Sequence, residues 1–510
     1  MHPVDQSATA ARLRAATSGA DWAAVVAMID RSWVELLQEL PDELLAALDQ
    51  VPSTVLNGRP RLRFAREHLR MLTGQHSPST YRLITTTADP ADDIDRLALL
   101  TAQIIAARAA GSGDDVIRLI AIAHDLRRRQ SIESTPALAG ALPEMLYQWG
   151  LALERSGDFE GALLDYVESF DWAATVGHRM MQRAAGGALA YVHALHGRIA
   201  MAQTWLDKIP PSTPQDWWEP AYCLQAQLAE SLILSAQLRP PPRQDLLESV
   251  DAHELIQHWA SAFLVRAITC REPHAARRLR NDLDAFLTSL PPGQRHDPVN
   301  TAQVDLTRLL LSARACELGH HDLLDRPTTT AHLLRQAPAA VHAMRLARYG
   351  KAGLALRIAA PLLDVDGSRP RILVPALLAT AIATTDTPRR HDLLTEAALV
   401  GHAHQHFDPF AFLPPDLRAE AARLLDALGD TDVAERLRAP EVEGRFLPAT
   451  LTPRERLVAE HAADGLSSTE IAAALSVSVN TVKTQLRSVY RKLGITSRAE
   501  LRHLHQADPS

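Results

Sequence analysis

The chain has 510 residues, 46% of them hydrophobic and 22% charged, with a net charge of −7. This composition is typical of a soluble globular protein of about two to four domains. Three widely separated cysteines exclude a disulfide framework and a zinc knuckle; neither a signal peptide nor a membrane-length apolar run is present, so we expect a cytoplasmic protein. Arginine outnumbers lysine 49 to 4, which indicates a GC-rich genome and hence a bacterial source.

Residues 1–437 are predicted to be helical almost throughout. Leu and Ala dominate this part of the chain, strand-like alternation is scarce, and Pro or Gly recurs between helical stretches. Residues 1–130 repeat less clearly than the segment that follows. We therefore expect them to form a separate N-terminal helical subdomain.

The clearest internal repeat lies within residues 131–437. Small and aromatic residues there resemble the tetratricopeptide pattern, in which small residues let paired helices approach and aromatic residues fill the space between them. One unit is marked by Leu146, Gly150, Leu153, Gly157, Phe159, Ala162 and Tyr166, and a related one by Ala190, Gly197, Ile199, Ala202 and Leu206. The pattern favours a solenoid of helix pairs over a single globular bundle.

Residues 438–450 have the Pro, Gly and charge mixture of an interdomain linker. The segment that follows, residues 451–510, carries three capping boxes, in which Ser or Thr stands three positions before Glu: Thr452–Glu455, Ser467–Glu470 and Ser497–Glu500. Together with Ser478 as an N-cap, they predict four short helices in the order of a helix-turn-helix unit. The inward faces of the first two helices are predicted to carry Leu457, Val458, His461 and Ala462, and Ile471, Ala472 and Leu475.

The third of these helices, residues 478–494, is predicted to be amphipathic and basic. Its apolar stripe and its basic face both recur at helical spacing, and they consist of Val482, Leu486, Val489 and Leu493, and of Lys483, Arg487 and Arg491. Residues 451–510 contain eight Lys or Arg and six Asp or Glu, whereas the rest of the chain contains 45 and 54. Positive charge therefore gathers on this helix, and the acidic remainder should discourage stray contact with nucleic acid.

This C-terminal segment resembles the LuxR-type helix-turn-helix signature without a gap. The resemblance is carried by Leu451, Thr452, Arg454, Glu455, Gly465–Ser467, Glu470–Ala472, Leu475, Ser478, Thr481–Lys483 and Lys492–Gly494. One departure is Gln485, where many members of the family carry histidine. We expect this side chain to face either the DNA backbone or the seam between the helices.

The resemblance implies two sets of DNA contacts: base edges would be approached by Lys483, Thr484 and Arg487, and phosphates by Ser478, Thr481, Arg491 and Lys492. Arginine can bond bidentately to guanine, and threonine can contact the thymine methyl group. Phosphate contacts fix the register on the duplex without reading sequence. Apart from these contacts, Glu455 and Arg498 are interpreted as an internal ion pair that ties the first helix to the last.

The DNA-binding unit is expected to act as a homodimer on two half-sites. The last helix of the unit is the predicted dimer contact, through Leu501, Leu504 and His505. These three residues follow the third capping box and are spaced along one side of a helix.

A helical-repeat region followed by a LuxR-type terminus also resembles the large MalT-like regulators, the LAL group. Those usually begin with a nucleotide-binding module that carries a P-loop. The one Gly-Lys pair of this chain, Gly350-Lys351, is followed by alanine and lacks the leading glycine. We therefore expect the repeat and DNA-binding portions without the ATPase, and neither ATP-driven switching nor control by aspartyl phosphorylation.

Other candidate sites are weaker. His402, His404 and His406 lie two positions apart, which suits a metal only in an extended segment, and nearby prolines favour a solvated loop. Trp217 and Trp218 either pack within a Pro-rich loop or line a ligand groove. Because no nucleophile and base have motif-level spacing, we expect no enzyme activity, no cofactor and no metal.

The sequence thus predicts an all-α protein, a tetratricopeptide-like solenoid followed by a four-helix LuxR-type domain, that regulates transcription. The helical repeats would sense a small-molecule or protein effector and control binding of the C-terminal domain to double-stranded promoter DNA. The alternative is a protein-interaction scaffold that recruits a partner to DNA.

Overall fold

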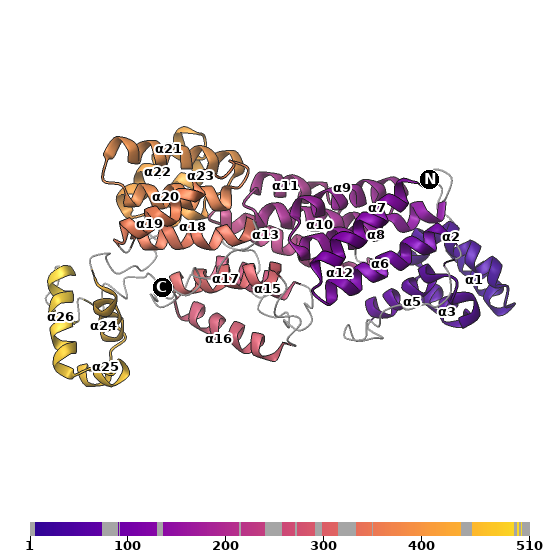
Figure 1. Cartoon of the computed structure of the whole chain (residues 1–510), viewed down its shortest axis with the longest axis horizontal. Coiled ribbons are helices and arrows are strands. Elements are labelled where there is room, and N and C mark those ends of the chain that lie inside the picture. Colours follow the sequence, from indigo (N-terminus) through magenta and orange to yellow (C-terminus); the bar gives the residue numbers. More distant parts are fainter. Residues whose placement is uncertain are drawn as a thin grey trace.

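The computed structural model is helical wherever it describes the chain, and no strand occurs in these residues (Figure 1). It describes residues 6–73, 90, 92–129, 136–213, 216–239, 258–270, 273–290, 298–314, 333–348, 350–439, 451–493, 497, 498 and 501. The all-α class predicted from the sequence is confirmed for this part of the chain. None of its helices combines the length and the apolar character that a bilayer span requires.

The first helices lie before residue 130, and aspartates cap two of them. They are α1 (Gln6–Ser18), α2 (Trp22–Glu39), α3 (Pro41–Gln50), α4 (Ser53–Leu56), α5 (Pro60–Leu72), α6 (Asp93–Ala109) and α7 (Gly113–Arg128). The side chain of Asp21 accepts from the amide of Ala24 at 3.0 Å, and Asp92 accepts from Asp95 at 2.8 Å. Each carboxylate satisfies an amide that the first turn of its helix leaves unbonded.

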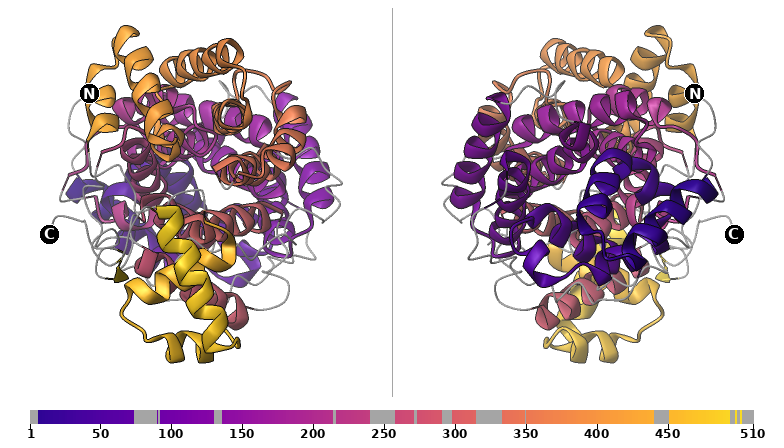
Figure 2. Two further views of the ribbon diagram at one scale, coloured as in Figure 1. Left: turned by 90° about the vertical axis from the view of Figure 1, so that its left-hand side faces the viewer. Right: turned by 90° about the vertical axis from the view of Figure 1, so that its right-hand side faces the viewer.

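The following helices pack largely against their neighbours in sequence. They are α8 (Pro136–Ser156), α9 (Phe159–Val176), α10 (Arg179–Leu195), α11 (Ile199–Lys208), α12 (Glu219–Tyr222), α13 (Leu224–Ala236), α15 (Trp259–Thr269), α16 (Pro273–Ser289) and α17 (Pro298–Arg314). The last group comprises α18 (Leu333–Arg348), α19 (Ala352–Ala359), η4 (Ala360–Leu362), α20 (Pro370–Ala383), α21 (Thr387–His404), η5 (Asp408–Phe412), α22 (Pro415–Ala427) and α23 (Thr431–Arg438). Seen along the long axis of the molecule, these helices wrap around that axis (Figure 2).

The helix pair expected from residues 146–166 is present as α8 and α9. Gly157 turns the chain between them with φ +94°, and Asp158 caps α9 by accepting from the amide of Gly161 at 3.0 Å. A Cβ atom at Gly150 would lie only 2.8 Å from the ring of Tyr166. The missing side chain at position 150 therefore lets the two helices approach with the tyrosine ring between them.

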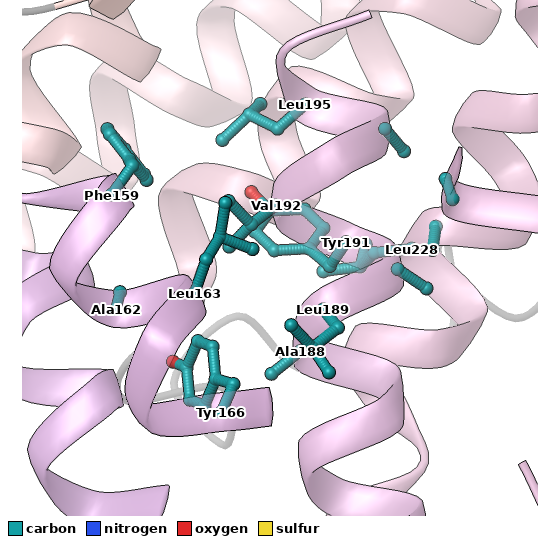
Figure 3. Packing of buried hydrophobic residues seen from close by; sticks show 14 of the residues in the cluster. Phe159, Ala162, Leu163, Tyr166, Ala188, Leu189, Tyr191, Val192, Leu195 and Leu228 are labelled. Atoms are coloured by element: carbon teal, nitrogen blue, oxygen red, sulfur yellow. The ribbon is translucent and has the colours of Figure 1, made fainter. Parts of the chain in front are cut away.

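One apolar core extends from Leu13 of α1 to Leu437 of α23. Within it, Figure 3 shows Leu163 of α9 directed toward Val192 of α10. Helices α2, α6 and α7 contact α8, so the helices on both sides of residue 130 share this core. A smaller cluster around Trp259 joins α15, α16 and α17.

Two local predictions are decided by burial. Trp218 is 2% exposed, and Trp217 donates its indole N–H to the carbonyl of Gln38 at 3.0 Å, so both tryptophans pack within the protein. The solvated loop predicted around the histidine triplet is wrong. Helix α21 continues through His402 to His404, and His406 is only 1% exposed. Within the described residues, no group of His, Cys, Asp and Glu is arranged to hold a metal ion.

The second half of the helical region caps two helices of the first half. Arg371 donates to the carbonyl of Ala194 at the end of α10 at 3.0 Å. The amide of Phe407 donates to Ala236 at the end of α13 at 2.9 Å, and Arg436 donates to Gln237 at 2.6 Å. The Ala194 carbonyl also accepts from the amide of Gly197, whereas the donors from Phe407 and Arg436 satisfy carbonyls at the end of α13, where a helix supplies no donor of its own.

Candidate nucleic-acid interface

The C-terminal residues form a small helical unit with a core of its own. Its helices are α24 (Pro453–Ala463), α25 (Ser468–Ala474) and α26 (Val479–Leu493), coloured yellow in Figure 1. The core consists of Leu451, Val458, Ala459, Ala462, Ala463, Ile471, Ala472, Val482, Leu486, Val489 and Leu501. Three of the four residues that α24 contributes to this core are alanines, and such short side chains let α26 pack close to it.

Two of the predicted capping boxes are confirmed in full. The amide of Thr452 donates to the Glu455 carboxylate at 2.7 Å, and the Glu455 amide donates back to the Thr452 hydroxyl at 3.3 Å. Ser467 and Glu470 exchange the same bonds at 2.6 and 3.2 Å, which lowers the pKa of the Glu470 carboxyl. Gly465, with φ +94°, ends α24 as predicted. The starts of α24 and α25 are thus encoded within four residues each.

The turn between α25 and α26 positions the basic helix. Ser476 adopts φ +53°, and the amide of Val477 donates to the carbonyl of Ala472 at 3.0 Å. Ser478 then caps α26, because its Oγ accepts from the amide of Thr481 at 3.1 Å and lies 2.8 Å from the Thr481 hydroxyl. The two hydroxyls therefore sit at the N-terminus of α26, where the helix dipole and free amides favour an anion such as phosphate.

The two faces of α26 separate as the sequence predicts. Val482, Leu486 and Val489 are buried in the core, whereas the side chains of Lys483, Thr484 and Arg487 are exposed. Positions i, i+1 and i+4 lie on one side of a helix, so these three residues form a single outward surface. A helix anchored by one stripe and exposing cations on the other has the form that enters a major groove.

Two more residues of α26 are placed by the structure. Gln485 is half-buried and its Oε1 has no hydrogen-bond partner in the described part of the chain, so it lies toward the seam between the helices. Asn480 is exposed in the first turn, and its carbonyl accepts from the Thr484 hydroxyl at 2.9 Å.

The predicted inward face of α24 needs a correction. Val458 and Ala462 are buried as expected, but the other inward residue is Ala459. Leu457 is 37% exposed, and His461 is only half-buried. The buried side of α24 therefore includes Val458, Ala459 and Ala462, and Leu457 lies outside it.

Glu455 and Arg498 have partners other than each other. The Glu455 carboxylate accepts from the Ser488 hydroxyl of α26 at 2.5 Å. Arg498 donates to the carbonyl of Ala462 at 3.1 Å and to that of Leu466. These contacts join Glu455 to α26 and Arg498 to the end of α24 and the residues after it; the predicted ion pair between the two residues stays a prediction.

A buried carboxyl in α24 has an unusual proton affinity. Burial raises the pKa of Glu460 to about 7, while Arg277 of α16 and Arg456 oppose the shift. Glu460 is 8% exposed. Arg277 therefore lies within electrostatic reach of the C-terminal unit.

Several of the predicted contact residues lie outside the part of the chain that the structure describes. Arg491 and Lys492 belong to α26, but their side chains are outside the described part. Leu504 and His505 lie outside the described residues altogether. Leu501 is fully buried in the core of the unit.

Comparison with known proteins gives one match. Residues 449–505 match the model of the family described as bacterial regulatory proteins, luxR family (GerE). No curated protein and no solved structure matches the chain. The C-terminal unit is therefore a LuxR-type helix-turn-helix DNA-binding domain, which implies DNA-binding transcriptional regulation.

Proposed function

We propose that the protein is a sequence-specific transcription regulator that reads promoter DNA with α26. The observation that carries this proposal is the exposed surface formed by Lys483, Thr484 and Arg487 on a helix whose opposite side is buried. Lysine and arginine donate to guanine, and threonine offers a methyl group to thymine. Asn480, exposed one turn earlier, adds an amide that suits adenine.

Phosphate contacts surround this reading surface. We assign them to Ser478, Thr481, Arg491 and Lys492. The first two offer hydroxyls and helix-end amides, and the other two extend the basic face along the same helix. Contacts of this kind hold α26 in register while its base-reading residues discriminate sequence.

The protein would bind DNA as a homodimer on two half-sites. We place the dimer contact at Leu504 and His505, which lie outside the described residues, and at Leu501, which belongs to the domain core. Two such domains related by a two-fold axis would recognise sites about one helical turn apart.

The helical region would act as a tetratricopeptide-like sensor, in the manner of MalT-like regulators without their ATPase. Support comes from the α8–α9 pair, in which Gly150 admits the ring of Tyr166. It also comes from the positive φ of Gly157 and Gly197, which turn the chain between α8 and α9 and between α10 and α11. An effector that binds this region would alter how the C-terminal domain meets DNA.

The reading surface is tested by selecting preferred sequences from random duplex DNA with the full-length protein. We expect the wild-type chain to enrich a discrete motif and the Lys483→Ala/Arg487→Ala variant to enrich none, with unchanged helical circular dichroism. The matched control replaces two exposed basic residues of the helical region, Lys351 and Arg389, and should enrich the wild-type motif. If the α26 variant selects that motif as well, the assignment is wrong.

A further inference from the structure

Basic side chains gather where the turn between α10 and α11 meets the start of α20 and the end of α21. Two histidines belong to the end of α10, Arg198 precedes α11, Arg371 lies in the first turn of α20, and His406 follows α21. We call this group the corner cluster; it consists of His193, His196, Arg198, Arg371 and His406. Figure 1 shows α11 beside α21, and the two helices are in contact.

A close backbone approach brings the cluster together. The amide of Arg371 donates to the carbonyl of His196 at 3.4 Å, and its guanidinium donates to Ala194 at 3.0 Å. Gly197 has φ +83°, and a Cβ atom there would lie 2.9 Å from the amide nitrogen of Arg371. Only glycine allows this contact, so Gly197 is required for Arg371 to lie against the end of α10.

The cluster is buried, yet much of its hydrogen-bonding capacity is unused. His196, Arg371 and His406 are 5%, 8% and 1% exposed. In the described part of the chain, no hydrogen bond reaches the following buried atoms: Nδ1 of His193, Nε2 of His196, Nε of Arg198, Nε of Arg371 and both ring nitrogens of His406. Buried polar atoms are nearly always bonded, so several unbonded nitrogens at one corner indicate a polar ligand that bridges them.

Two carboxylates lie near members of the corner cluster. His406 Nδ1 lies 3.2 Å from Asp408 Oδ1, and Arg198 Nη1 lies 3.8 Å from Glu160 Oε1. Burial and the neighbouring arginines lower the pKa of His193 and of His196 to about 3; burial lowers the pKa of His406 to about 4. The imidazoles are therefore neutral at physiological pH and can gain a proton when negative charge arrives.

We propose that the corner cluster binds a small molecule bearing an oxyanion, a carboxylate or a phosphate group, between Arg198, Arg371 and His406. Guanidinium N–H groups donate well to both oxyanions. The ligand would bridge the α10–α11 turn and α20, which belong to different halves of the helical region. This site is independent of the proposed DNA contacts. Only an effect of the bound ligand on DNA binding rests on the proposed sensing role.

Binding should take up protons. A bound oxyanion favours the charged form of the imidazoles, which the guanidinium groups of Arg198 and Arg371 disfavour in its absence. Besides the cluster, the titratable and charged groups that face it are His404, Tyr191, Arg369, Asp408, Glu160 and Asp366. Because the bound form holds more protons, affinity for the anion rises as the pH falls.

Thermal unfolding of the full-length protein with sodium sulfate tests the site. Sulfate keeps its charge between about pH 6 and about pH 8. Any change with pH in the rise in Tm that sulfate causes therefore arises from groups of the protein, such as the histidines. We expect sulfate to raise Tm above a sodium chloride control of equal ionic strength, and more so at the lower pH. Succinate and phenyl phosphate, run the same way, distinguish a carboxylate ligand from a phosphate one.

Variants separate the site from the general stabilising effect of sulfate. Arg371→Gln and the less buried Arg198→Gln should each lose most of the sulfate-specific rise in Tm, whereas the exposed Arg357→Gln of α19 should keep it. Arg198→Gln keeps the test open if Arg371→Gln fails to fold. An equal rise in Arg198→Gln and Arg357→Gln, or no rise above chloride with any of the three anions, overturns the proposal. Because no DNA is present, either result leaves the assignment of α26 untouched.

Discussion

The carboxylate of Glu455 joins the start of α24 to the third turn of α26. One oxygen accepts from the amide of Thr452 at 2.7 Å, and the other accepts from the Ser488 hydroxyl at 2.5 Å. Ser488 stands beside Arg487 in the sequence, so the contact restrains the rotation of α26 about its own axis. A single buried side chain therefore both starts the first helix and orients the reading surface.

Loss of this contact should loosen α26. We expect Ser488→Ala to cost about 1.5 kcal/mol, the lower end of the range for a hydrogen bond to a charged group. Glu455→Ala should cost about 2–3 kcal/mol, because it also removes the reciprocal cap of α24. Amide hydrogen exchange across α26 in the full-length protein measures both effects. Glu435→Ala on the exposed side of α23 is the control, and unchanged protection in Glu455→Ala would contradict the structural role.

Base-reading and phosphate-binding residues should differ in their response to salt. Arg487→Ala is expected to weaken binding to the preferred site by about 1–3 kcal/mol and to relax base preference at one position. Arg491→Ala should weaken all sequences alike and reduce the slope of log Kd against log salt concentration by about 1. Titrations of the selected and a scrambled duplex at several salt concentrations measure these effects. A change of sequence preference in Arg491→Ala would contradict its assignment to phosphate. The control, Arg389→Ala, should change neither the affinity for the selected duplex nor the slope against salt.

A methyl group at Gly150 should strain the α8–α9 pair. It would lie 2.8 Å from the Tyr166 ring, whose hydroxyl is held by Glu154 at 2.8 Å, so the ring cannot move without breaking that bond. We expect Gly150→Ala to destabilise the protein by about 1–3 kcal/mol. Gly353→Ala is the matched control, because it meets no atom within 4 Å and should stabilise α19 by up to about 1 kcal/mol. Chemical denaturation compares them, and equal stability of the two variants would refute the packing argument.

The buried carboxyl of Glu460 should make stability depend on pH near neutrality. Its folded-state pKa is raised to about 7 by burial, above the ordinary value of 4.5. The protonated group contributes stability that is fully present below pH 4.5 and is lost as the pH rises through about 7. Glu460→Gln should therefore stabilise the protein at alkaline pH and flatten the pH profile of Tm. Glu435→Gln is the control, and a profile identical to wild type in Glu460→Gln would exclude Glu460 as the cause.

Features that depend on neighbouring residues could be predicted from the sequence. The boxes at Thr452 and Ser467 are confirmed because both partners of each hydrogen bond lie within three positions. The stripe of α26 is confirmed at Val482, Leu486 and Val489 because helical periodicity alone places them on one side. The predicted inward face of α24 was partly wrong: Leu457 is exposed, and Ala459 is buried instead. Packing against the rest of the unit decides which side of this helix faces the core.

What the sequence by itself determined is where the C-terminal helices begin, and which side of α26 carries charge. Both follow from local hydrogen bonds and a period of 3.6 residues. The tertiary structure alone decided that Glu455 reaches Ser488, that His406 is buried, and that Arg371 meets the end of α10, 177 positions before it. Such contacts depend on how whole helices stack, and that depends on the combined burial of many apolar side chains rather than on any motif.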